Sequence, residues 1–137
     1  MRIALGTDEI TPLTVAIEEL LVERGHEVVA VAEGDAWPDV GRAVGHAVAG
    51  PSARADRGIV CCWTGTGVSI AANKVDGVRA ALCTDAETAR GARRWNDANV
   101  LAIGLRLTSS EVATEMIDAF LTTDADADEA ANIAKLP

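Results

Sequence analysis

The chain has 137 residues, about the length of one domain, and 49% of them are apolar, which is enough for an ordinary single core. Its 21 acidic residues exceed its 12 basic ones, giving a formal net charge of -9, and such a surface repels nucleic acid and anionic membranes. No apolar run approaches the roughly 20 residues of a membrane-spanning helix, and a strand expected from Arg2 leaves no room for a signal peptide.

The cysteines point to a reducing compartment. There are three of them, Cys61, Cys62 and Cys83, an odd number with two adjacent, so they do not suggest a disulfide framework. No Cys-x-x-Cys or Cys/His spacing suited to a metal occurs either. We therefore expect a cytoplasmic protein without a bound metal.

The first half of the chain alternates strand and helix patterns. The apolar run Arg2–Gly6 predicts a strand, and the amphipathic pattern of Thr11–Arg24 predicts a helix that the following glycine ends. A second strand is expected at Glu27–Val31. A second helix is expected at Pro38–Ala49, with its proline near the first turn, where no N–H is needed.

The second half continues this alternation. Arg57–Cys62 predicts a buried strand, which leads into a glycine-rich turn at Trp63–Gly67 and a helix from about Val68 to Lys74. The later elements are a strand at Val78–Leu82, a helix at Asp85–Trp95 with an aspartate cap, a strand at Asn99–Ile103, and a helix at Ser109–Leu121 capped by Ser109 or Thr108. The tail 122–137 is acidic and alanine-rich, and is either a short helix packed on a partner or disordered.

Five strands separated by helices predict βαβ units and a parallel sheet. Right-handed crossovers place helices on both faces, so we expect a three-layer α/β/α Rossmann-like sandwich over residues 1–121, followed by the acidic tail 122–137. Ligands of such folds bind beyond the carboxyl ends of the strands. Those ends carry Thr7–Glu9, Glu33–Asp35, Cys62–Gly67 and Gly104–Arg106.

The segment with the most chemical content runs from Gly58 to Lys74 and joins a strand, a Gly/Thr turn and a helix. Gly65 and Gly67 let backbone N–H groups approach a ligand closely. With the helix N-terminus they form a site for negative charge, either a phosphate or an oxyanion that develops during a reaction. The turn lacks the Gly-Lys-Ser/Thr of a Walker loop and the three-glycine dinucleotide spacing, which disfavours a dinucleotide- or flavin-binding domain.

Cys62 lies where the predicted strand meets this turn. A thiol near a helix N-terminus can act as a base or nucleophile, and the alternative is a buried apolar residue, the usual fate of a free cysteine. Cys61 points to the other side of the strand by period-two alternation and is expected in the core, as is Cys83.

Four segments resemble the signature of the ribose-5-phosphate isomerase B and galactose-6-phosphate isomerase family. They are Gly6–Glu9, Gly58–Lys74, Gly77–Ala80 and Arg94–Gly104, and the most specific parts are Ser69–Lys74 and Asn96–Leu101. The resemblance implies an aldose–ketose isomerase that works through an enediol(ate) and needs no metal or organic cofactor. It also implies a homodimer or homotetramer with active sites shared between subunits.

The resemblance also implies roles for individual residues. A cysteine at the position of Cys62 is often the base that moves a proton between C1 and C2, and Thr64 belongs to the turn that stabilises charge on the substrate oxygen. Asp8 would hold sugar hydroxyls, Asn96 would contact the reacting carbons and Arg106 would help hold a phosphate. The full set of expected substrate-binding residues is Asp8, Glu9, Trp63, Gly65, Thr66, Gly67, Ser69, Trp95, Asn96 and Arg106.

The sequence departs from the family pattern at several of these positions. Glu9 replaces a common histidine, Trp63 replaces a small residue, and Trp95 replaces the histidine that opens the sugar ring. The two tryptophans either stack on a sugar or simply pack. Ring opening has passed to Glu9, Asp8 or Asp97, or else the substrate arrives open.

The family's C-terminal phosphate clamp is also missing, since 122–129 contains no arginine or histidine. Arg106 remains a candidate phosphate anchor, as do Arg79, Arg93 and Arg94. These departures favour a small sugar or sugar phosphate other than ribose 5-phosphate, such as a four-carbon ketose phosphate. The alternative is a catalytically weak or silent sugar-binding or partner subunit of the same family.

Overall fold

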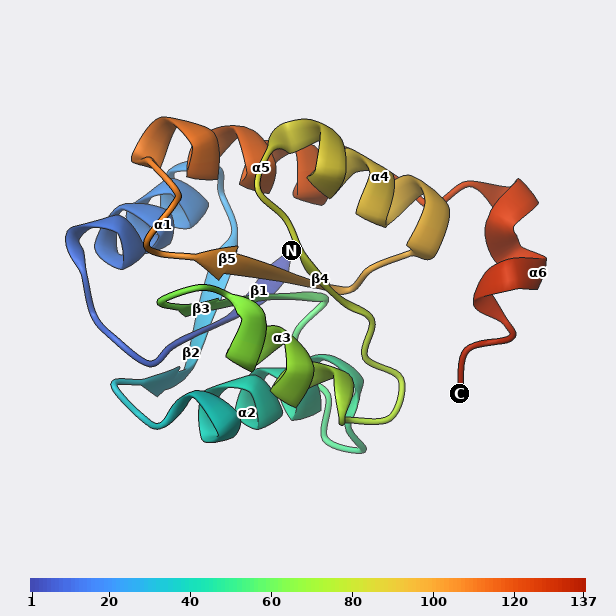
Figure 1. Ribbon diagram of the computed structural model, residues 1–137, viewed down its shortest axis with the longest axis horizontal. Helices are drawn as coiled ribbons and strands as arrows, with labels where there is room; N and C mark the ends of the chain where they lie inside the picture. The colour runs from blue at the N-terminus through green and yellow to red at the C-terminus, as the bar shows by residue number, and fades with distance from the viewer.

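The computed structural model describes residues 1–137 and consists of a five-stranded parallel sheet between two layers of helices (Figure 1). The strands, in the order β2-β1-β3-β5-β4, are β1 (Arg2–Thr7), β2 (Glu27–Glu33), β3 (Arg57–Cys62), β4 (Ala80–Leu82) and β5 (Val100–Gly104). The helices are α1 (Pro12–Glu23), α2 (Trp37–Ala49), α3 (Thr66–Asn73), α4 (Ala86–Asn96), α5 (Ser110–Thr122), the 3-10 turn η1 (Ala127–Glu129) and α6 (Ala130–Ile133). The expected fold class is confirmed.

The chain changes direction across the sheet between β1 and β3. From β1 it moves to β2 on one side, and it then returns to β3 on the other side. In open parallel sheets the crevice for a ligand lies at such a switch point, outside the carboxyl ends of the strands. The topology therefore points to the residues that follow β1 and β3.

Two elements differ from their predicted bounds for visible reasons. Helix α3 starts at Thr66 because Gly65 adopts a left-handed conformation (φ +77°) and serves as the N-cap. Strand β4 has only three residues, since the Arg79 N–H is bonded to the side-chain oxygen of Asn99 at 2.7 Å instead of to the sheet. The expected caps Asp85 and Ser109 accept bonds from Thr88 and Val112.

Strand β3 divides its side chains between two cores. Ile59 and Cys61 join the core under α1, α4 and α5, whereas Val60 and Cys62 join the core under α2 and α3. Period-two alternation along a strand produces this separation. The predicted core position of Cys61 is confirmed, and Cys62 lies on the face from which α3 approaches the sheet.

Helices α2 and α3 lie in close contact because α2 presents two glycines to α3. A Cβ atom on Gly41 would lie 2.5 Å from the Ala71 Cβ and 2.8 Å from the Val68 carbonyl oxygen. A Cβ atom on Gly45 would lie 2.8 Å from a methyl group of Val75. Helix α2 therefore sets the position of α3 and of the turn that precedes it.

The tail forms η1 and α6, which bury no residue and lie beyond the end of α4 (Figure 1). Two hydrogen bonds join it to the domain: the Asp126 N–H donates to the Arg94 carbonyl at 2.7 Å, and the Arg93 side-chain Nε donates to the Thr123 carbonyl at 3.1 Å. No helix of the chain combines the length and apolarity that crossing a membrane requires.

The α2–α3 contact predicts different responses of two mid-helix glycines to alanine. Gly41→Ala should lower the free energy of unfolding by about 1–3 kcal/mol, because the new methyl group meets the backbone of α3. Gly91→Ala should be neutral or stabilising by up to about 1 kcal/mol, because its methyl group meets only the half-exposed ring of Trp95. Urea unfolding of both variants checks this, and equal stabilities would contradict the close packing of α2 on α3.

Candidate functional site

The carboxyl ends of β1, β3 and β5 bring three predicted site residues into one region. Thr7 pairs with Cys61, and the Asp8 N–H continues that pairing to the Cys61 carbonyl at 3.3 Å. On the other side, the Arg106 N–H donates to the Trp63 carbonyl at 2.9 Å. Asp8, Cys62 and Arg106 therefore lie on neighbouring strand ends at the switch point of the sheet.

The Gly/Thr turn lies against the end of β5, and glycine is required on both sides of that contact. A Cβ atom on Gly65 would lie 2.8 Å from the Gly104 nitrogen, and one on Gly104 would lie 2.7 Å from the Thr64 carbonyl oxygen. The hydroxyls of Thr64 and Thr66 are hydrogen-bonded at 2.8 Å. Close approach of the two backbones locks the turn in place.

This turn presents the N-terminus of α3. Gly65 has no side chain to cap the helix, so no side chain accepts bonds from its first N–H groups. Such N–H groups, together with the helix dipole, favour negative charge. The geometry of Gly65, Thr66 and Gly67 is therefore suited to a phosphate or an oxyanion.

The three thiols differ in their surroundings. Burial raises the pKa of Cys61 to about 12 and that of Cys83 to about 11, so both thiols stay protonated near neutral pH. Cys62 is 5% exposed and belongs to the core face covered by α3. Of the three, Cys62 alone directly precedes the Gly/Thr turn.

Asp8 has a carboxylate oxygen that nothing in the chain satisfies. Its Oδ1 atom is buried and has no hydrogen-bond partner. Burial, and to a lesser extent the neighbouring Glu9, raises the pKa of the Asp8 carboxyl. The Thr7 hydroxyl donates to the Glu9 carbonyl at 2.7 Å and closes the turn that carries Asp8, while the Glu9 side chain is exposed.

Two tryptophans stand beside the turn. Trp63 is 55% exposed, and the guanidinium carbon of Arg106 lies 6.0 Å from its ring centroid, in the range of a cation–π contact. Trp37, which we did not predict as a site residue, packs on the turn from α2. A Cβ atom on Gly67 would lie 2.9 Å from its ring. The signal for Trp37 was its place just after the carboxyl end of β2.

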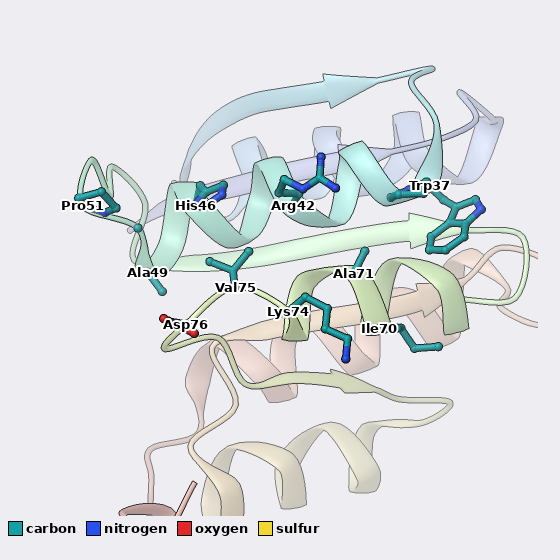
Figure 2. Close-up of a pocket in the computed structure, with 12 residues that line it drawn as sticks. Trp37, Arg42, His46, Ala49, Pro51, Ile70, Ala71, Lys74, Val75 and Asp76 are labelled. Atoms are coloured by element: carbon teal, nitrogen blue, oxygen red, sulfur yellow. The ribbon is translucent and has the colours of Figure 1, made fainter. Parts of the chain in front are cut away.

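Trp37 also marks one end of a cavity of about 560 Å³ between α2 and α3. Figure 2 shows Trp37 and Ile70 at the end near the strand tips, and Pro51 and Ala49 at the far end. The cavity therefore runs between the two helices, from Trp37 and Ile70 to Ala49 and Pro51. No group of three or more His, Cys, Asp or Glu side chains could hold a metal ion.

Asn96 does not lie with the other predicted site residues, and Trp95 lines a hollow with Leu82 at the edge strand β4. Asn96 lines a hollow with Ala80, and Ala80 pairs with the same residue of β5, Val100, as Gly58 does at the start of β3. Gly58 precedes Cys62 by four residues, or about 13 Å at the rise of a strand. Within one chain, the end of α4 that carries Asn96 therefore lies at the amino ends of the strands, whereas Cys62 lies at the carboxyl end of β3.

Asp97 and two of the candidate phosphate anchors have structural partners. Asp97 accepts bonds from Arg79 at 2.9 Å and from Arg93 at 2.7 Å. Arg93 is 2% exposed and also donates to the Ala98 carbonyl. These three side chains hold the left-handed end of α4, which leaves Arg106 as the arginine at the strand ends near Cys62.

The fold and site together define a Rossmann-like protein with a turn for negative charge and a thiol at the switch point of its sheet. The family model described as Ribose/Galactose Isomerase matches residues 3–136. The chain belongs to this family and is an aldose–ketose isomerase by class, so the resemblance in its sequence is confirmed.

Individual relatives agree with this assignment. The chain is 41% identical over 126 residues to the galactose-6-phosphate isomerase subunit LacB of Clostridium acetobutylicum, covering 88% of this chain and 72% of that protein. It is 37% identical over 130 residues to the D-erythrulose-4-phosphate isomerase of Pectobacterium atrosepticum, covering 90% and 84%. The structure of ribose-5-phosphate isomerase B from Clostridium thermocellum superposes with a TM-score of 0.91 at 39% identity, covering 99% and 95%.

Proposed function

We propose that the protein interconverts a short aldose phosphate and the corresponding ketose phosphate, with Cys62 as the base that moves the carbon-bound proton. The observation that carries this proposal is the position of Cys62 directly before the Gly/Thr turn that leads into the uncapped N-terminus of α3. A silent partner subunit would have no need of both features. The intact turn and thiol therefore favour the enzyme.

In this mechanism the Cys62 thiolate removes the proton from the carbon beside the carbonyl. Negative charge then develops on the carbonyl oxygen, where the N–H groups of Gly65, Thr66 and Gly67 stabilise it. The Thr64 hydroxyl on the turn and Ser69 in the first turn of α3 contribute further polar contacts. Return of the proton from Cys62 to the neighbouring carbon completes the transfer between the two carbons.

Substrate binding would use the groups around this turn. Arg106 would hold the phosphate, and Trp63 and Trp37 would form apolar walls against the C–H face of the sugar. Position 95 holds a tryptophan, whose indole N–H donates a hydrogen bond but does not exchange a proton near neutral pH. Trp95 therefore cannot replace the ring-opening histidine of the family. A four-carbon ketose phosphorylated on its terminal hydroxyl cannot close a five-membered ring, and one relative bears the name of such a substrate.

We further propose a cytoplasmic homodimer or homotetramer with shared active sites. Within one chain, Asn96 lies toward the amino ends of the strands and does not reach Cys62. A second copy can bring the end of its α4 to this site. Trp63 and Ile70, which are 55% and 58% exposed beside the turn, offer apolar surface for that contact. Three free cysteines fit a reducing compartment.

The two adjacent cysteines predict opposite effects of alanine. Cys62→Ala should lower kcat by about 100-fold or more, the scale of general acid–base catalysis. Cys61→Ala should leave kcat nearly unchanged and reduce stability, because it removes a fully buried side chain from the other core. Steady-state kinetics and thermal unfolding check both, and full activity of Cys62→Ala would rule out the assigned base.

The substrate proposal predicts poor turnover of ribose 5-phosphate and better turnover of D-erythrulose 4-phosphate. The physical reason is that the four-carbon sugar needs no ring opening, whereas ribose 5-phosphate does. Kinetics on a panel of phosphorylated and free aldoses and ketoses measures this. A kcat/KM for ribose 5-phosphate of about 10⁴ M⁻¹s⁻¹ or above would show that the departures are compensated.

The shared site predicts association at micromolar concentration. Analytical ultracentrifugation should give a dimer or tetramer, and a mixture of Cys62→Ala with Asn96→Ala chains should recover part of the activity that each variant lacks. Recovery requires that one site take Cys62 and Asn96 from different chains. A monomer, or the absence of any recovery in mixed dimers, would contradict the proposal.

A further inference from the structure

The buried Oδ1 atom of Asp8 is the one side-chain nitrogen or oxygen in the chain that is buried without a hydrogen-bond partner. Buried polar atoms in folded proteins are almost always paired, since leaving one unpaired destabilises the fold. A carboxylate oxygen is an acceptor with no donor of its own. The Oδ1 atom of Asp8 therefore needs a hydrogen-bond donor that the chain itself does not supply.

The place of Asp8 in the fold indicates where that donor comes from. Asp8 directly follows β1 at the switch point, and its N–H is bonded to the Cys61 carbonyl, which puts it level with Cys62 on the adjacent strand. The Thr7 hydroxyl bonds the Glu9 backbone and keeps the Asp8 turn in one conformation. Oδ1 is thus held in place beside the proposed base.

Isomerisation of an aldose and a ketose moves two protons. One passes between neighbouring carbons, and Cys62 is the base that we propose for this transfer. The other must leave the hydroxyl oxygen and reach the former carbonyl oxygen. The N–H groups of α3 and the guanidinium of Arg106 are donors only, and the hydroxyls of Thr64 and Thr66, which can accept and donate, are hydrogen-bonded to each other at 2.8 Å. The site therefore needs a second group that both accepts and donates.

We propose that Asp8 is that group: its carboxylate takes the hydroxyl proton of the enediolate and returns it to the neighbouring oxygen. In the ketose direction, the O2–H proton passes to Oδ1 of Asp8 while the C2–O bond becomes a carbonyl. The same proton is then delivered to O1, and Cys62 protonates C1. Each proton removed is returned, so no co-reactant is consumed.

The other carboxylates fit this role less well. Asp97 is paired with Arg79 and Arg93 at the opposite edge of the sheet. The Glu9 side chain is exposed and has no buried oxygen. Burial favours the protonated form of Asp8, and so does the charge of Glu9. A carboxyl that readily holds a proton is suited to pass one between two oxygens.

The test separates the two proton transfers, and it rests on the proposed isomerase activity. In D2O, Cys62 exchanges the carbon-bound hydrogen of the substrate for deuterium even when the second transfer fails. With D-erythrulose 4-phosphate followed by NMR, Asp8→Asn should lose conversion by about 100-fold while exchange into recovered substrate falls much less. The ratio of exchange to conversion should rise at least about 10-fold over wild type.

Three further variants make the outcome decisive. Cys62→Ala should lose exchange and conversion together, Asp8→Glu should recover part of the conversion, and Asp76→Asn, which removes an exposed carboxylate, should match wild type. A parallel fall of exchange and conversion in Asp8→Asn would reduce Asp8 to a binding or structural residue. Absence of both reactions in wild type, across the sugar panel, would instead refute the proposed function.

Discussion

Close approach of backbone to backbone around α3 is the constraint on which the rest of the site depends. Gly65 and Gly104 let the turn lie against the end of β5, and Gly41 lets α2 lie against α3. A side chain at any of the three would overlap main-chain atoms that cannot swing away. Because packed interiors transmit such overlaps rather than absorb them, the helix N-terminus and the thiol beside it keep one relative position.

The two adjacent cysteines show how strand geometry alone assigns chemistry. Cys61 and Cys62 are consecutive residues of β3, so their side chains point to opposite faces of the sheet. Each face has its own core. Complete burial raises the pKa of Cys61 to about 12, so this thiol stays protonated near neutral pH and cannot act as a base. Its neighbour reaches the end of the strand on the face that α3 covers.

Few arginines of the chain are left to bind a negatively charged substrate. Arg79 and Arg93 are committed to Asp97, where they hold the end of α4, and the tail carries carboxylates. Arg106 is left beside the turn, resting over the ring of Trp63. A cation beside the turn is consistent with the short sugar phosphate that we propose as the substrate.

The sequence by itself determined the element order, the parallel sheet and the turn after β3, because these follow from local periodicity and from glycine positions. It also placed Cys61 in the core, since alternation along a strand needs no tertiary information. Contacts between distant segments were decided only by the tertiary structure: Trp37 on Gly67, the pairing of Asp97 with Arg79 and Arg93, and the unpaired oxygen of Asp8. The separation of Asn96 from Cys62 belongs to the same group, because a sequence motif does not record at which edge of the sheet a helix ends.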